Sequence, residues 1–170
     1  MNAAFALFIN KLARIAIIIS SFGLILMTLI VGWQVFARYV LNASPAWSES
    51  SALLLMLYYI MLAAAVGVYE NFHLGLKVLT DSVSENSRRR LVIFSNSLIL
   101  IFGIAMFICG ARLAQFTADH IIPTLEISRS LAYLPFSIAG LLISIFALEK
   151  ILVAIANKNS LQSTKDAQAV

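Results

Sequence analysis

The acidic residues and histidines of this 170-residue sequence lie at the ends of its long apolar runs, between them or after the last one. Glu49 and Glu70 are at the two ends of one run, and His73 and His120 are in connections between runs. An ion- or proton-coupled carrier usually places an ionisable side chain near the middle of the bilayer, where the charge needs a partner. None of the four longest apolar runs has Asp, Glu, Lys, Arg or His in its middle, so we do not expect ion coupling by this chain alone.

Other kinds of membrane chemistry would also need residues that the sequence lacks. A four-helix disulfide-generating enzyme needs pairs of cysteines, and Cys109 is the only cysteine. A membrane cytochrome needs haem-ligating histidines inside its spans. The sequence has no metal-ligand spacing, no nucleophile–base arrangement and no Gly-rich phosphate loop. We therefore expect no catalytic, metal or cofactor-binding residues, and no enzyme activity.

The composition is that of a membrane protein. Hydrophobic residues make up 61% of the chain and charged residues 12%, whereas a soluble domain carries about a quarter charged residues. The formal net charge is +4. Because the basic residues flank the apolar runs instead of lining one patch, nucleic acid is not an expected partner. Basic flanks of this kind are attracted to anionic membrane lipids.

Four charge-free runs predict four transmembrane helices. They cover residues 15–37, 50–69, 91–111 and 130–148. At a rise of about 1.5 Å per residue, each helix crosses about 30 Å of hydrocarbon. The expected fold class is an all-α integral membrane protein. One four-helix membrane domain would cover residues 1–157, followed by a polar, disordered cytoplasmic tail over residues 158–170.

Two amphipathic segments predict short interfacial helices that lie on the membrane, because their apolar residues recur at helical spacing. The first stripe is Phe5, Phe8, Ile9 and Leu12. The second stripe is Phe72, Leu76, Leu79 and Val83, with Lys77 on the opposite face. A loop with chance periodicity is the alternative for each segment.

The distribution of Lys and Arg predicts that both termini are cytoplasmic. Nine of the 12 basic residues lie before the first run, between the second and third runs, or after the fourth. The other three are Arg38, Arg112 and Arg129. The 38–49 and 112–129 connections are therefore expected outside, and the 70–90 connection inside.

Local features predict how the helix ends are built. Ser44-Pro45 is typical of an N-cap followed by proline at the first helical position, which would place Glu49 near the positive end of the second helix. Pro135 is expected in the first turns of the fourth helix, where its missing N–H costs little. Gln34 and Arg38 share one face, and they either contact a partner helix or form a snorkelling pair at the helix end.

Further side chains are expected to hold the helices together. The short first connection makes a charge pair between Arg38 and Glu49 geometrically possible. Glu149 and Lys150 are expected to anchor the fourth helix at the inner interface. Small residues one or two turns apart predict faces where helices can approach closely. These pairs are Ala63 and Gly67, Gly103 and Gly110, and Gly140 and Ser144.

Two outer connections carry a family resemblance. They are VFARYVLNASPAWSES, residues 35–50, and PTLEISRSLAYLPFSIAG, residues 123–140. With four spans and inward termini, the chain resembles the small membrane subunit of TRAP transporters, the tripartite ATP-independent periplasmic carriers, over most of its length. The family's motif corresponds here to Arg38, Tyr39, Trp47, Glu49, His73, Pro123, Ser128, Arg129, Tyr133, Pro135 and Gly140. Many members have two consecutive acids where this chain has Glu49-Ser50.

The resemblance implies a role as well as a fold. In this family, a periplasmic binding protein delivers an organic acid, such as sialic acid or a four-carbon dicarboxylate, to a pair of subunits in the bacterial inner membrane. The large multi-span permease holds the substrate and sodium sites, and the small subunit packs beside it as a non-catalytic scaffold. The residues expected at the subunit interface or in its support are Gln34, Arg38, Tyr39, Trp47, Glu49, Arg129, Tyr133, Pro135 and Gly140.

Three alternatives remain open at the level of sequence. A stand-alone small transporter, working as a homo-oligomer, would be favoured by a carboxylate in the middle of a span. A membrane anchor or assembly subunit of another complex would be favoured by histidines or cysteines inside the spans. Within the TRAP interpretation, Arg38 or Arg129 could attract an incoming carboxylate instead of contacting a partner subunit.

Overall fold

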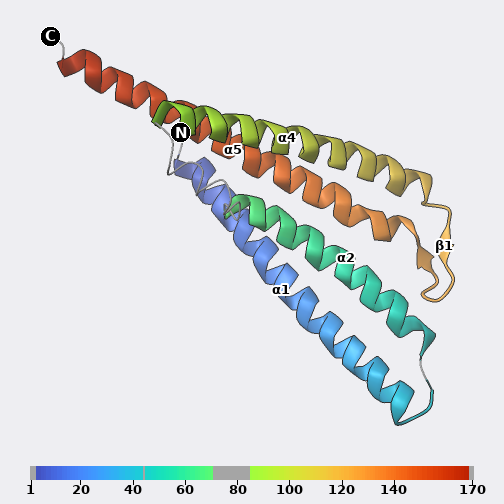
Figure 1. The fold of residues 1–170 in the computed structure, drawn as a ribbon. Coiled ribbons are helices and arrows are strands. Elements are labelled where there is room, and N and C mark those ends of the chain that lie inside the picture. Colours follow the sequence, from blue (N-terminus) through green and yellow to red (C-terminus); the bar gives the residue numbers. More distant parts are fainter. Residues whose placement is uncertain (1–2, 44, 71–84, 169–170) are drawn as a thin grey trace.

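The computed structural model describes residues 3–43, 45–70 and 85–168. Within these residues, four helices are long and apolar enough to cross a membrane. They are α1 (Ala3–Tyr39), α2 (Ala46–Tyr69), α4 (Glu85–Phe116) and α5 (Ser130–Gln168). Two short strands, β1 (Ile121–Ile122) and β2 (Ile127–Ser128), lie between α4 and α5 (Figure 1). The predicted all-α membrane fold with four spans is confirmed.

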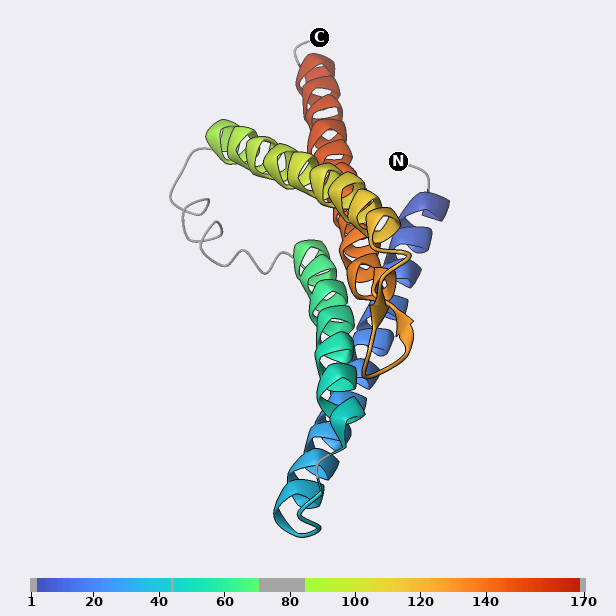
Figure 2. The same cartoon turned by 90° about the vertical axis from the view of Figure 1, so that its right-hand side faces the viewer.

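The helices form two hairpins. In the first, α1 packs against α2, and in the second, α4 packs against α5. The two hairpins meet where α2 packs on α5, and they diverge toward the α1–α2 and α4–α5 connections (Figure 1). Figure 2 shows that α4 crosses α5 at a marked angle. Both described ends of the chain lie at the end of the bundle opposite those connections (Figure 1), as an even number of spans requires.

The buried core lies where three helices converge. Its members are Ile9, Ala13 and Ala16 from α1, Ala65 and Val66 from α2, and Leu142, Ile143 and Phe146 from α5. The alanines let the helix backbones approach closely, while Phe146 fills the centre and is completely buried. The Tyr69 ring packs against Phe146 with 5.2 Å between ring centroids. This core joins the α1–α2 hairpin to α5 of the second hairpin.

The predicted interfacial helix near the N-terminus is wrong as a separate element. Residues 5–12 are part of α1, and Ile9 is buried in the core instead of facing lipid headgroups. Helix α1 has 37 residues, so its length of about 55 Å exceeds the hydrocarbon thickness of about 30 Å. Lys11 and Arg14 do not end the helix, because a charged side chain interrupts no backbone hydrogen bond.

Two other expectations concern the inner side. The second predicted interfacial helix, with Phe72, Leu76, Lys77, Leu79 and Val83, lies outside the described residues. The tail that we expected to be disordered is helical in the structure, because α5 continues to Gln168. The backbone of α5 therefore extends about 20 residues past the end of the charge-free run at Leu148.

The start of α2 differs from the prediction by one residue. Pro45 is the N-cap, with an extended ψ of 126°, and no side chain caps the helix. The first helical position is Ala46. Ser48, which is fully buried, donates its hydroxyl to the Pro45 carbonyl at 2.7 Å. The Ser48 hydroxyl in the first turn of α2 thus binds the carbonyl of Pro45, the residue that was predicted to be the first of the helix.

The β1–β2 hairpin was not predicted. Its strands are antiparallel, with Ile121 opposite Ser128 and Ile122 opposite Ile127. The turn closes when the Glu126 N–H donates to the Ile122 carbonyl at 2.9 Å. Glu126 has a φ of 53°, a left-handed conformation that costs a non-glycine residue some free energy. Strands of two residues carry no periodic signal that a sequence could show.

Candidate functional site

At the diverging end of the molecule, the hairpin tip contacts the start of α2. The hydroxyl oxygens of Ser50 and Thr124 lie 2.6 Å apart in a hydrogen bond between residues 74 positions apart. This contact joins the first helical hairpin to the second at the ends that carry the α1–α2 and α4–α5 connections. The Ser50 side chain at the start of α2 thus makes an intramolecular contact.

The base of the connection between α4 and α5 is closed by hydrogen bonds on either side of the strands. The Arg129 N–H donates to the His120 carbonyl at 2.7 Å. Ser128 donates its hydroxyl to the Ala118 carbonyl at 2.7 Å and accepts from the Ser130 N–H at 3.3 Å. The motif residues Ser128 and Arg129 therefore shape this connection through their hydroxyl and backbone groups, and the Arg129 side chain remains exposed.

The charged and aromatic residues predicted for the outer end do not converge. Arg38 and Glu49 are both exposed, and no ion pair joins them within the part of the chain that the structure describes. Tyr39 is 77% exposed and Trp47 is 45% exposed. Gln34 is half-buried on α1. The charge pair that the sequence allowed between Arg38 and Glu49 does not form in the single chain. Both side chains are exposed on its surface.

Pro135 lies inside α5, as predicted, but at its sixth residue. Because proline has no N–H, it cannot donate to the carbonyl of Leu131 four residues earlier. The hydroxyl of Tyr58, from α2, donates to that carbonyl at 2.9 Å. Tyr133, two residues before the proline, is half-buried. The proline thus creates an acceptor on α5 that a side chain of α2 uses.

Gly140 lies at the closest approach of α4 and α5. A Cβ added there would be 2.5 Å from the backbone nitrogen of Phe107 and 2.8 Å from the Gly103 carbonyl oxygen. Ser144 faces Gly103, and Gly110 faces Ser137. The predicted small faces of these two helices therefore meet. A Cβ on Gly67 would meet nothing within 4 Å, so the small face of α2 is open in the single chain.

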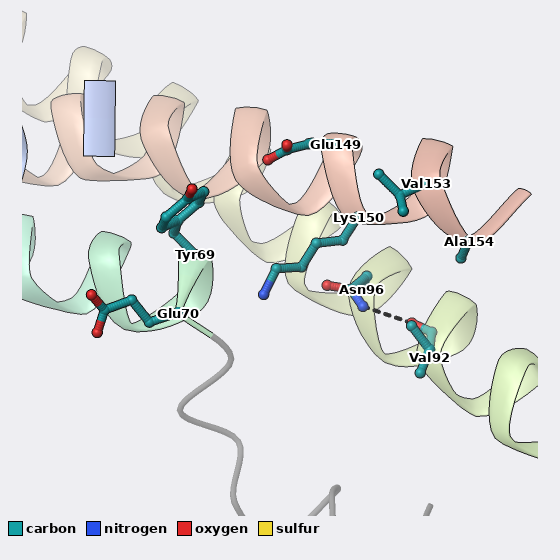
Figure 3. Close-up of a pocket in the computed structure, with 8 residues that line it drawn as sticks. All are labelled: Tyr69, Glu70, Val92, Asn96, Glu149, Lys150, Val153 and Ala154. Atoms are coloured by element: carbon teal, nitrogen blue, oxygen red, sulfur yellow. Dashed lines mark hydrogen bonds between the residues drawn. The ribbon is translucent and has the colours of Figure 1, made fainter. Parts of the chain in front are cut away.

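At the opposite end, residues of α2, α4 and α5 and the adjoining Glu70 line an open pocket of about 440 Å³ (Figure 3). Lys150 of α5 donates to the backbone carbonyl of Val68 in the last turn of α2. Asn96 of α4 donates its amide to the Val92 carbonyl at 2.8 Å. Lys150 was expected to anchor the fourth helix at the inner interface. In the structure it bonds to α2, because the last carbonyls of a helix have no partner within that helix.

The described residues offer no site for a metal ion: they include no group of three or more His, Cys, Asp or Glu side chains placed to hold one. Cys109 is exposed on α4. Glu49 and Glu70 lie at helix ends, as the sequence indicates. Among the described residues, side-chain hydrogen bonds join helices to one another and order the α4–α5 connection.

Sequence reasoning missed the side-chain contacts between elements: Ser20 with Tyr59, Ser50 with Thr124, Tyr58 with Leu131, and Lys150 with Val68. One of these contacts left a signal in the sequence, because Pro135 implies that the Leu131 carbonyl lacks its helical donor. The sequence does not show which helix lies beside α5, so it could not identify Tyr58 as the donor. The Ser50–Thr124 contact likewise depends on the unpredicted hairpin.

Comparison with known proteins agrees with these features. The family described as "Tripartite ATP-independent periplasmic transporters, DctQ component" matches residues 27–157. The sialic acid TRAP transporter small permease protein SiaQ of Vibrio cholerae is 28% identical over 138 residues, which is 78% of this chain and 80% of that protein. The family match runs from within α1 to within α5 and includes the α1–α2 and α4–α5 connections. The chain therefore belongs to the DctQ family, as a small permease subunit of a TRAP transporter in the inner membrane, and it is not an enzyme.

Proposed function

We propose that this chain is the non-catalytic scaffold of its TRAP transporter, holding a large permease subunit that carries substrate and sodium. The observation that supports this role most directly is the lack of ionisable residues in the middle of its spans. A subunit that moved an organic acid or coupled it to sodium would need polar or charged groups at that depth. The substrate and sodium sites are therefore assigned to the partner.

The apolar surface that the chain leaves uncovered supports a large membrane partner. Only 11% of the most apolar stretch of α1, and the same share of α4, is buried within the chain. Large side chains point outward on both helices, including Phe22 and Leu29 on α1 and Ile101 and Phe102 on α4. This apolar surface can face lipid. Because it covers two helices, it is also large enough to bind a multi-span permease.

We assign the exposed residues at the outer end to the seating of the two subunits. These are Arg38, Tyr39, Trp47, Glu49 and Arg129, with Gln34 and Tyr133 beside them. Because Arg38 and Glu49 do not pair with one another in the described chain, each can meet a group of the partner. Pro135 and Gly140 support this surface from inside, through the contacts of α5 with α2 and α4.

The substrate is proposed to be an organic acid of the sialic acid or dicarboxylate type, delivered by a periplasmic binding protein. The resemblance to a sialic acid TRAP small permease supports this class. The nine-to-three distribution of Lys and Arg supports cytoplasmic termini, with the outer connections facing the periplasm.

Reconstitution tests this role. Liposomes that hold this chain alone should take up no sialic acid or dicarboxylate under a sodium gradient. Liposomes that also hold the large permease, supplied with the binding protein, should take it up. Uptake by the chain alone would show that it carries substrate and would refute the scaffold.

A further inference from the structure

The pocket between α2, α4 and α5 combines opposite charges with an aliphatic wall. Its polar and aromatic lining is Tyr69, Glu70, Asn96, Glu149 and Lys150, and its aliphatic lining is Val92, Val153 and Ala154. Figure 3 shows the Lys150 side chain extending from α5 toward the end of α2, between the carboxylates and Asn96. An anion would be repelled by Glu70 and Glu149 in this pocket, and a cation would be repelled by Lys150.

The pocket lies at the depth of a membrane interface. Glu70 directly follows the last residue of α2, and Glu149 directly follows the charge-free run 130–148. Val92 is the second residue of the run that starts after three consecutive arginines. A tyrosine at this depth is typical of the headgroup region. The molecules that are abundant at this depth, with a polar head and apolar chains, are phospholipids.

The polar groups of the pocket fit the two ends of a zwitterion. Asn96 is only 8% exposed, and its amide nitrogen is used by the Val92 carbonyl. Its carboxamide oxygen points toward the side of the pocket where Lys150 lies (Figure 3). That oxygen and the carboxylates of Glu70 and Glu149 are acceptors for a cation that donates hydrogen bonds, and the Lys150 ammonium attracts an anion.

We propose that this pocket binds one molecule of phosphatidylethanolamine. Its phosphate lies against Lys150, and its primary ammonium donates to Asn96 and to a carboxylate of Glu70 or Glu149. The glycerol and the start of the acyl chains lie along Val92, Val153 and Ala154. Phosphatidylcholine has a cation without N–H donors, and phosphatidylglycerol has no cation to balance the carboxylates, so both fit less well. This inference does not depend on the transport role.

Lipid titration tests the selectivity. The purified full-length chain, stripped of lipid in detergent, is titrated with short-chain forms of the three phospholipids, and bound lipid is counted by native mass spectrometry. We expect one phosphatidylethanolamine molecule per chain, bound about tenfold more tightly than the other two, the effect of one charge-assisted hydrogen bond. Equal binding of the three lipids, or no stoichiometric binding, would overturn the proposal.

Paired variants locate the site. Ala154→Phe fills the pocket and removes no polar group, whereas Leu152→Phe adds the same ring to an exposed position of α5 outside the pocket. Lys150→Gln removes the cation of the pocket, and Lys11→Gln removes an exposed cation of α1.

Ala154→Phe and Lys150→Gln should weaken phosphatidylethanolamine binding at least about tenfold, and both controls, Leu152→Phe and Lys11→Gln, should bind it normally. Because Lys150 also bonds to α2, unchanged binding in Ala154→Phe is the result that would refute this location.

Discussion

At the residue scale, two side chains hold α2 to α5 by donating to backbone carbonyls that lack a helical partner. Tyr58 donates to Leu131, whose usual donor is removed by Pro135. Lys150 donates to Val68 in the last turn of α2. An unsatisfied backbone carbonyl is costly in apolar surroundings, so both hydrogen bonds should stabilise the packing of α2 on α5.

Removing the Tyr58 hydroxyl should therefore destabilise the subunit. Tyr58→Phe leaves the Leu131 carbonyl without its donor, and we expect a loss of about 1 kcal/mol in the free energy of unfolding. Reversible unfolding in mixed micelles measures this change. Tyr59→Phe is the matched control, because the Tyr59 hydroxyl makes no hydrogen bond within the described residues.

A second substitution tests the cause of that loss. Pro135→Ala restores an N–H that can donate to the Leu131 carbonyl, so Tyr58→Phe should cost much less in the Pro135→Ala protein than in the wild type. An equal cost in both backgrounds would show that the hydroxyl does not act through the carbonyl left by the proline.

The exposed charges at the outer end give a second prediction at this scale. Arg38→Gln and Glu49→Gln should each lower the yield of assembled complex up to about fivefold, the effect of about 1 kcal/mol. Co-purification with the large permease measures the yield, and uptake assays measure the apparent substrate constant, which should stay unchanged. Arg112→Gln, an exposed arginine outside the predicted interface, is the control. A normal yield with a raised substrate constant in Arg38→Gln or Arg129→Gln would instead assign these residues to substrate attraction.

At the element scale, the sequence predicts the helices better than it predicts their ends. The four apolar runs identify the spans because lipid requires a continuous apolar surface. A search for charge-free runs ends each span at the first charged residue. The helices continue further, since α1 includes Lys11 and α5 includes Lys150. The Ser50–Thr124 contact was beyond prediction, because it depends on two elements meeting and not on either alone.

The packing of α4 on α5 gives the prediction for this scale. Gly140→Ala places a methyl group 2.5 Å from the Phe107 nitrogen, and a helix backbone cannot move aside as a flexible side chain can. We expect the two helices to separate and the free energy of unfolding to fall by about 1–3 kcal/mol. Mixed-micelle unfolding measures the loss.

Gly67→Ala is the control for this packing test, because nothing lies within 4 Å of the added methyl group. Alanine is a better helix former than glycine, so this variant should be as stable as the wild type or slightly more stable. Equal stability of Gly140→Ala and Gly67→Ala would contradict the close packing of α4 on α5.

At the scale of the whole molecule, the two hairpins are held together by few contacts. Within lipid, burial of apolar surface does not drive helices together, so small-residue packing and hydrogen bonds must do so. The core of α1, α2 and α5 lies toward one end, and the Ser50–Thr124 bond joins the hairpins at the other. The molecule is thus a frame with exposed apolar faces, which suits a subunit that completes its packing against another protein.

The orientation of this frame is the last prediction. The structure places both described chain ends at one end of the bundle (Figure 1), and the excess of Lys and Arg at that end favours the cytoplasm. In a Cys109→Ala background, cysteines at Ala43 and Thr124 should react with a membrane-impermeant maleimide added to intact spheroplasts, while one at Ser163 should react only after permeabilisation. Since Thr124 bonds to Ser50, Ala43 is the less perturbing of the two outer positions. Labelling of Ser163→Cys in intact spheroplasts, with Ala43→Cys protected, would invert the frame and place the outer connections in the cytoplasm, out of reach of a periplasmic binding protein.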